Sequence, residues 1–201
     1  MHEVIAQCLR NLEGHFRSQG MCYALLRGGY EKYIQALLGF ELFGSTGGNI
    51  LTEVSMKGRL SIDFLGNHDG VLTAIEMGVN ALCNPRENGL INHIIDDVNK
   101  VLNNHFARQV FTISVLDSMC QCHAGRHLPF VKYQNRYRIP IDQQARTEQL
   151  RHAIQSRKYF SHPSLQTVQH NTFSTVEFRG YQMELHFLVC GPFVNPLTKW
   201  W

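Results

Sequence analysis

Two acidic residues, Asp63 and Glu76, lie in neighbouring β-type segments at a spacing that brings their side chains together. The Asp69-Gly70 pair between these segments favours a tight type I′ hairpin turn. With this turn His68 pairs with Val71, and the same register puts Asp63 opposite Glu76 on one face of the sheet. Two carboxylates at about 5 Å repel each other by roughly 3 kcal/mol at an effective dielectric constant of about 20. A divalent cation, a raised pKa or a basic neighbour would relieve this repulsion.

A third acid, Glu53, lies on the preceding β-type segment. The apolar residues of that segment join the core face if residues 56–58 form a three-residue turn. Glu53 then falls on the face of Asp63 and Glu76, near Ser61. Carboxylate oxygens suit Mg2+ or Mn2+, so one interpretation is that Asp63 and Glu76 offer ligands for such an ion, with Glu53 placed to complete its shell or orient a water. The alternative is an open, solvated sheet face on which the acids merely repel.

The elements that position these acids follow from the hydrophobic periodicity. Residues 49–56, 60–64 and 71–80 alternate with a period of 2, which predicts three strands. Residues 84–106 repeat apolar side chains at helical spacing, and the β-branched run 109–116 reads as a buried strand. A helix between two strands predicts a right-handed crossover to a parallel strand.

The flanking parts of the chain complete one predicted α/β domain over residues 1–201. Its mixed central sheet is built on an α-β-β-β-α-β core over residues 30–116 and is flanked by helices on both faces. Residues 117–201 form an extension of loop, helix and hairpin that adds to the sheet edge or covers it. The further elements expected are helices over 2–17 and between Gly29 and Gly44, a loop over 118–141, a helix over 142–159, and a hairpin of 175–178 and 182–190 around Arg179-Gly180.

This order of elements resembles the core of the PD-(D/E)XK (restriction-endonuclease-like) nuclease superfamily, over residues 30–116. The resemblance also rests on Asp63 in Ser-Ile-Asp-Phe and on Glu76 in Ile-Glu-Met-Gly. It implies that these two acids bind a metal ion. In the superfamily a lysine two residues after the second acid assists the attacking water, and Gly78 occupies that position here.

Lys57, at the turn after the first strand, and Lys100, on the following helix, are the candidates for the missing lysine. The resemblance then implies a Mg2+-dependent nuclease that hydrolyses phosphodiester bonds of DNA or RNA. The alternative is a catalytically degenerate nuclease-fold protein that acts as a nucleic-acid or protein-binding module, so whether the chain is an enzyme stays open at this point. A Lys ammonium or Gln amide close to both Asp63 and Glu76 would favour the nuclease.

Composition and charge narrow the class of protein and its partners. Hydrophobic residues make up 44% of the chain and charged residues 17%, which excludes intrinsic disorder. Without a signal peptide or a membrane-spanning run, we expect a cytoplasmic protein with no membrane partner. The net charge of +3 is compatible with a nucleic-acid partner, and a homodimer is left open. The best basic-aromatic segment contains four candidate nucleic-acid-binding residues, which are Arg126, Lys132, Arg136 and Arg138.

A small group of cysteines and histidines offers a different site. Cys120, Cys122, His123 and His127 have the side chains that bind zinc. Their spacing lacks the usual C-x2-4-C pair and a second ligand pair. A loop with free thiols is the preferred interpretation, and zinc is the alternative.

Overall fold

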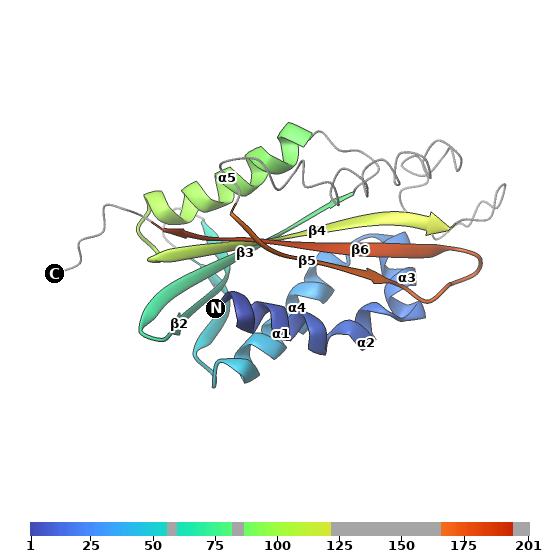
Figure 1. Ribbon diagram of the computed structural model, residues 1–201, viewed down its shortest axis with the longest axis horizontal. Helices are drawn as coiled ribbons and strands as arrows, with labels where there is room; N and C mark the ends of the chain where they lie inside the picture. The colour runs from blue at the N-terminus through green and yellow to red at the C-terminus, as the bar shows by residue number, and fades with distance from the viewer. Residues whose placement is uncertain (56–59, 82–86, 122–165, 195–201) are drawn as a thin grey trace.

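Six strands form one mixed sheet in the computed structural model, which describes residues 1–55, 60–81, 87–121 and 166–194 (Figure 1). The strands lie in the order β1-β2-β3-β4-β6-β5. β3 and β4 run parallel, whereas all other neighbouring strands run antiparallel. The strands are β1 Ile50–Ser55, β2 Ser61–His68, β3 Val71–Ala81, β4 Gln109–Gln121, β5 Thr167–Ser174 and β6 Gln182–Val194.

Helices cover both faces of the sheet (Figure 1). Four helices from the amino-terminal part lie on one face, and their core with the sheet includes Phe16 and Phe187. A fifth helix lies on the other face, where Val98 and Val101 pack with Ala74. The helices are α1 His2–Asn11, α2 Glu13–Phe16, α3 Gln19–Arg27, α4 Glu31–Ser45 and α5 Glu87–Asn103. Within the described ranges, none of them has both the length and the apolar character needed to cross a membrane.

The predicted fold class is confirmed: the chain is a single α/β domain with a mixed sheet between helices. From α4 to β4 the elements follow the predicted order α-β-β-β-α-β. The β2–β3 hairpin also has the predicted register, with His68 opposite Val71. Asp69 and Gly70 have positive φ angles of 52° and 76°, as a type I′ turn requires.

The amino-terminal helices differ from the prediction. The helix expected over residues 2–17 is divided into α1 and α2, and α3 follows directly. Ser18 begins α3, because its side-chain oxygen accepts a hydrogen bond from the backbone N–H of Met21 at 3.1 Å. Gly20 therefore lies within a new helix and does not end the previous one.

The strand β4 is longer than expected and includes residues assigned to a loop. Ser118 pairs with Glu184, and Asp117 pairs with Leu185. Asp117 and Ser118 are polar, but they are only 2% and 0% exposed. Their polarity therefore marks a buried polar part of the sheet, which a sequence pattern does not distinguish from a loop.

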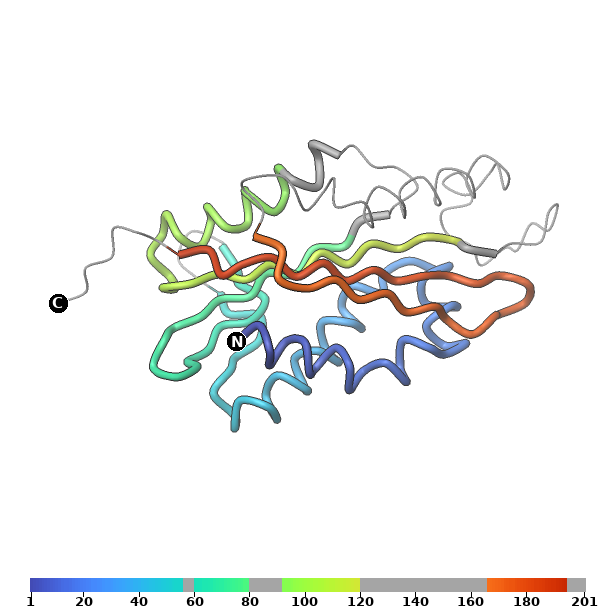
Figure 2. The backbone as a smooth tube through the Cα atoms, in the orientation of Figure 1, coloured from blue at the N-terminus to red at the C-terminus, as the bar shows by residue number. Residues whose placement is uncertain are grey.

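The closing hairpin adds two strands to the sheet, as expected. Phe178 pairs with Tyr181 around Arg179-Gly180, whose φ angles are 53° and 85°. The strand before the turn is β5 and not residues 175–178. The sequence pattern missed β5, because an edge strand of mostly polar residues has only a weak apolar alternation. Figure 2 shows the hairpin, in orange and red, beside the blue amino-terminal helices, which are far away in the sequence.

The register of β1 differs from the prediction by two residues. Ser55 pairs with Ser61, so the connection is longer than the three-residue turn expected at residues 56–58, which lie outside the described residues. The prediction that Glu53 lies near Ser61 is therefore wrong. The even register keeps Ile50 on the core side, as the apolar pattern requires.

Glycine is needed at one position where β1 and β2 pair. A Cβ atom on Gly66 would lie 2.3 Å from the backbone oxygen of Asn49 and 3.0 Å from the Cα of Ile50. Gly66 pairs with Ile50 in the ladder. The absence of a side chain at Gly66 thus allows the two strands to pair in this register. The same register puts Glu53 between the pairs Thr52–Phe64 and Val54–Ile62, at the level of Asp63.

Candidate functional site

Asp63 lies where β2 and β3 stop pairing. In the described part of the chain, their ladder ends with Phe64 opposite Ile75, and Asp63 has no ladder partner on either side. Its carboxylate makes the contacts instead. Oδ2 accepts a hydrogen bond from the backbone N–H of Met77 at 2.7 Å, and Oδ1 accepts one from Nε2 of Gln35 at 2.8 Å. Asp63 is thus held by both β3 and α4.

The interruption at Asp63 changes which side chains face α5. Ile62 packs with Ala74 and Val98 under α5, whereas Phe64 belongs to the core of the amino-terminal helices. In an uninterrupted strand two residues at this spacing share a face. The period-2 alternation over residues 60–64 predicts that Ile62 and Phe64 share one apolar face, and this prediction is therefore wrong.

Glu53 lies beside this interruption on β1, with a positive φ angle of 50°. Its carboxylate forms an exposed ion pair with Lys32 on α4, and this contact raises the pKa of Lys32. Nζ of Lys32 also donates to Oε1 of Gln35 at 2.9 Å. Glu53 and Asp63 therefore share a network with α4. The expected convergence of all three carboxylates is not seen, because Glu53 pairs with Lys32 whereas Glu76 contacts Lys100 on α5; the charge of Asp63 still acts on Glu76.

Glu76 is only 4% exposed and lies within the sheet, opposite Thr112 of β4. Its Oε1 lies 2.9 Å from Nζ of Lys100 on α5. Burial raises the pKa of Glu76 to about 7; the ammonium of Lys100 opposes this change, and the carboxylates of Asp63 and Asp97 add to it. A buried carboxyl group with a pKa near neutrality and a specific charged partner is typical of functional sites.

Lys100 and Gln35 are the basic and amide neighbours of the acids, and each contacts one of them. Lys100 was one of two candidates from the sequence. Gln35 and Asp97 were missed. Asp97 lies three residues before Lys100 on α5, with its Oδ1 3.9 Å from Nζ of Lys100. This spacing was visible in the sequence, but it does not distinguish Asp97 from the adjacent aspartate without knowledge of how the helix packs.

The donor atoms that Asp63 and Glu76 offer are carboxylate oxygens. Within the described residues, no three His, Cys, Asp or Glu side chains are arranged to hold a metal ion. Mg2+ commonly binds through one or two carboxylates and keeps several water ligands. Each oxygen of Asp63 accepts one hydrogen bond and retains a further lone pair. The chemistry of this pair of acids therefore fits Mg2+ or Mn2+.

Several predicted residues lie outside the described part of the chain. Lys57 is among them, so its candidacy for the lysine role is untested. The same applies to the basic-aromatic segment with Arg126, Lys132, Arg136 and Arg138. The candidate zinc ligands also lie outside the described part. They are the side chain of Cys120, together with Cys122, His123 and His127.

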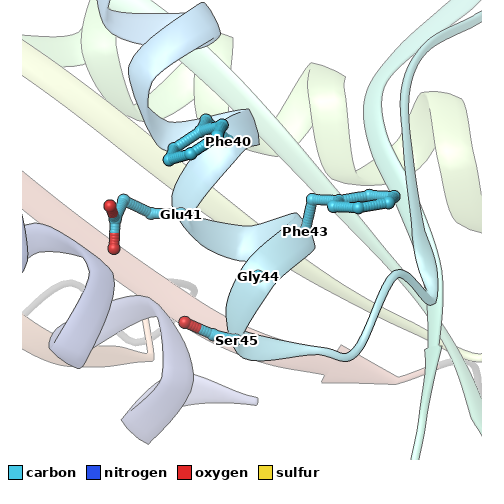
Figure 3. A pocket seen from close by; sticks show the side chains of 5 residues that line it. All are labelled: Phe40, Glu41, Phe43, Gly44 and Ser45. Atoms are coloured by element: carbon cyan, nitrogen blue, oxygen red, sulfur yellow. The ribbon is translucent and has the colours of Figure 1, made fainter.

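A pocket lies on α4 (Figure 3). It is lined by Phe40, Glu41, Phe43, Gly44 and Ser45. None of these residues contacts Asp63 or Glu76 through an interaction described above. The pocket therefore does not extend the site formed by the acids.

The titration of Glu76 predicts a pH dependence of stability in metal-free buffer. The pKa of Glu76 rises from 4.5 to about 7 on folding, so the folded protein binds more protons between these values. The free energy of unfolding then falls as the pH rises through this window, by up to about 3 kcal/mol. Glu76→Gln lacks this effect. In urea unfolding at pH 5, 6, 7 and 8, the free energy of unfolding of the variant should increase relative to that of the wild type as the pH rises. A difference that is the same at every pH would contradict the raised pKa of Glu76.

Comparison of this chain with protein families, with curated proteins and with solved structures finds no match. The functional argument therefore depends on the residues and contacts described above.

Proposed function

We propose that this chain is a Mg2+-dependent nuclease that hydrolyses phosphodiester bonds of DNA or RNA. The observation that carries the proposal is the ion pair of the buried Glu76 with the half-buried Lys100, whose Oε1 and Nζ lie 2.9 Å apart, next to the point where Asp63 interrupts the β2–β3 ladder. This arrangement combines two carboxylates for a metal ion with an ammonium group for a phosphate.

In this proposal Asp63 and Glu76 would hold the ion, whose chemistry when bound would be to polarise the phosphate and to lower the pKa of the attacking water. The hydrogen bonds from Met77 and Gln35 fix the direction of the Asp63 carboxylate. Lys100 takes the role of the missing lysine, because its ammonium stabilises negative charge that develops on the phosphoryl oxygens. Glu53 has a supporting role, since it fixes Lys32, which in turn contacts Gln35.

Membership of the PD-(D/E)XK superfamily is part of the same proposal. The predicted order of elements, the register of the β2–β3 hairpin and the parallel pairing of β3 with β4 support it. Gly78 in place of the lysine is the main departure. A nucleic acid is the partner that this function requires, whereas a homodimer and a cytoplasmic location stay predictions from the sequence.

Cleavage assays with plasmid DNA and with RNA oligonucleotides test the proposal. We expect the wild type to cut one of these substrates with Mg2+ and not with EDTA. Glu76→Gln should lower the rate by about 100-fold or more, because it removes a metal ligand. Glu3→Gln, on an exposed position of α1, should cut like the wild type. Cleavage that survives Glu76→Gln would contradict the proposal.

The second candidate is a degenerate nuclease fold that binds without cutting. One observation favours it: both carboxylate oxygens of Asp63 already accept hydrogen bonds, from Met77 and from Gln35. This candidate predicts that the wild type binds DNA or RNA in a gel-shift assay and cuts neither at any Mg2+ concentration. The cleavage assay therefore separates the two candidates.

A further inference from the structure

Three ionisable side chains of α5 form a row along one face of the helix. His93, Asp97 and Lys100 have the spacing i, i+4, i+7, which puts them on the same face. Nδ1 of His93 lies 3.6 Å from Oδ2 of Asp97, and Oδ1 of Asp97 lies 3.9 Å from Nζ of Lys100. Lys100 reaches Glu76. The row thus extends from Glu76 to His93, and the proposed function uses only its Lys100 end.

His93 lies against the backbone of β3 at Gly78. A Cβ atom on Gly78 would be 2.7 Å from Nε2 and 3.1 Å from Cδ2 of His93, so any other residue here would displace the imidazole. Gly78 follows Glu76 by two residues, and these two positions share one face of the strand. The imidazole therefore occupies the space above the position that the resemblance assigns to lysine.

The carboxylate of Asp97 lies 3.6 Å from Nδ1 of this imidazole and acts on it through its charge. A carboxylate beside Nδ1 favours the neutral tautomer that carries its proton on Nδ1 and leaves the Nε2 lone pair free to accept a proton. The side chain of His93 is 46% exposed, so water reaches the ring. Burial raises the pKa of Asp97, whereas the charges of His93 and Lys100 lower it.

We infer that His93, oriented by Asp97 and packed against Gly78, is the general base that accepts the proton of the attacking water; this inference rests on the proposed nuclease function. One O–H bond of the water breaks, its proton moves to Nε2, and the water oxygen forms the new P–O bond. The P–O bond to the leaving sugar oxygen breaks with its electron pair, and that oxygen takes a proton from solvent. The imidazolium then returns its proton to solvent. The products are a phosphate monoester and an alcohol.

Other titratable groups face this base and shape the choice of variants. They are Asp97 and Lys100 on α5 and Glu76 on β3, and the charge of Asp63 on β2 acts on both Asp97 and Glu76. Protonation of Glu76 also contributes to the acidic limb of a pH–rate profile. The informative comparison is therefore between two proteins that both retain Glu76.

The first test is the pH–rate profile of cleavage for the wild type and His93→Gln. The variant should lose about 100-fold in rate and bind Mg2+ as the wild type does. In a plot of the logarithm of the rate against pH, the acidic limb of the variant should rise less steeply, as expected when one deprotonation fewer is needed for activity. His68→Gln is the matched control, because Nε2 of His68 lies 3.4 Å from Oδ2 of Asp69 at the distant hairpin turn. This control should keep both the rate and the profile.

The second test is the tautomer of His93 in the metal-free protein, measured by 15N NMR at pH 8. We expect the proton on Nδ1 in the wild type and a loss of this preference in Asp97→Asn. A proton on Nε2 in the wild type would overturn the inference. This result does not depend on whether the variants fold, because it is measured on the wild type. If the wild type cuts and His93→Gln cuts equally fast with the same profile, the base assignment is wrong and the nuclease proposal stands. If the wild type cuts no nucleic acid with Mg2+, both fail together.

Discussion

If the proposed function holds, replacing Lys100 with methionine should lower Mg2+-dependent cleavage by about 100-fold or more. Methionine has a similar length but lacks the ammonium that lies 2.9 Å from Oε1 of Glu76. The loss acts in two ways. No positive charge then stabilises the phosphoryl oxygens, and the pKa of Glu76 rises above its value of about 7, because Lys100 is the charge that opposes the effect of burial. At neutral pH the variant therefore has a protonated Glu76 that is a poor metal ligand.

The matched control is Arg17→Met, which removes a cation from an exposed ion pair with Glu13 among the amino-terminal helices, on the other side of the sheet. It should retain most of the cleavage rate, and Lys100→Arg should retain more activity than Lys100→Met because the charge remains. Equal rates for Lys100→Met and the wild type would exclude Lys100 from the role of the missing lysine.

Replacing Phe16 with alanine lowers the free energy of unfolding by about 3–5 kcal/mol. Phe16, on α2, is fully buried against β5 and β6, two strands that are far away in the sequence. Its ring centroid lies 5.2 Å from that of Phe173 on β5 and 4.7 Å from that of Phe187 on β6. Alanine would leave a cavity between the amino-terminal helices and the closing hairpin, and urea unfolding measures the loss.

Phe40→Ala is the control for this substitution. Phe40, on α4, is 76% exposed, so its removal should change the free energy of unfolding by less than about 0.5 kcal/mol. Similar losses for the two variants would contradict the packing of the hairpin against α2.

The acid-bearing hairpin was predictable because its signals are local. The alternation of apolar residues in β2 and β3 and the Asp69-Gly70 turn together specify the register, and the ladder has His68 opposite Val71 as expected. The helix before β4 followed in the same way from its 3.6-residue period.

The interruption at Asp63 was not predictable from the same pattern. Ile62 and Phe64 are both apolar and both buried, although they face opposite sides of the sheet. The alternation of apolar residues alone therefore does not indicate that the strand changes its facing at Asp63. Its cause is tertiary, since the Asp63 carboxylate accepts hydrogen bonds from Met77 and Gln35, which lie on two other elements.

The identity of the lysine beside Glu76 was also a tertiary question. The sequence offered Lys57 and Lys100 without a preference. Lys100 reaches Glu76 because Val98 and Val101 pack against the sheet and so fix the rotation of α5. His93 and Gly78 are coupled by the same packing, which explains why a glycine that weakens a strand is compatible with this fold.

The most direct measurement of the central claim is a calorimetric titration of Mg2+, with Mn2+ in parallel, into the metal-free protein at pH 8. At this pH Glu76, with a pKa of about 7, is mostly ionised and able to bind a cation. The account predicts one site of millimolar or tighter affinity in the wild type, retained in Glu3→Gln and lost in both Asp63→Asn and Glu76→Gln. Equal heats for the wild type and these two variants would contradict the claim that Asp63 and Glu76 hold a metal ion.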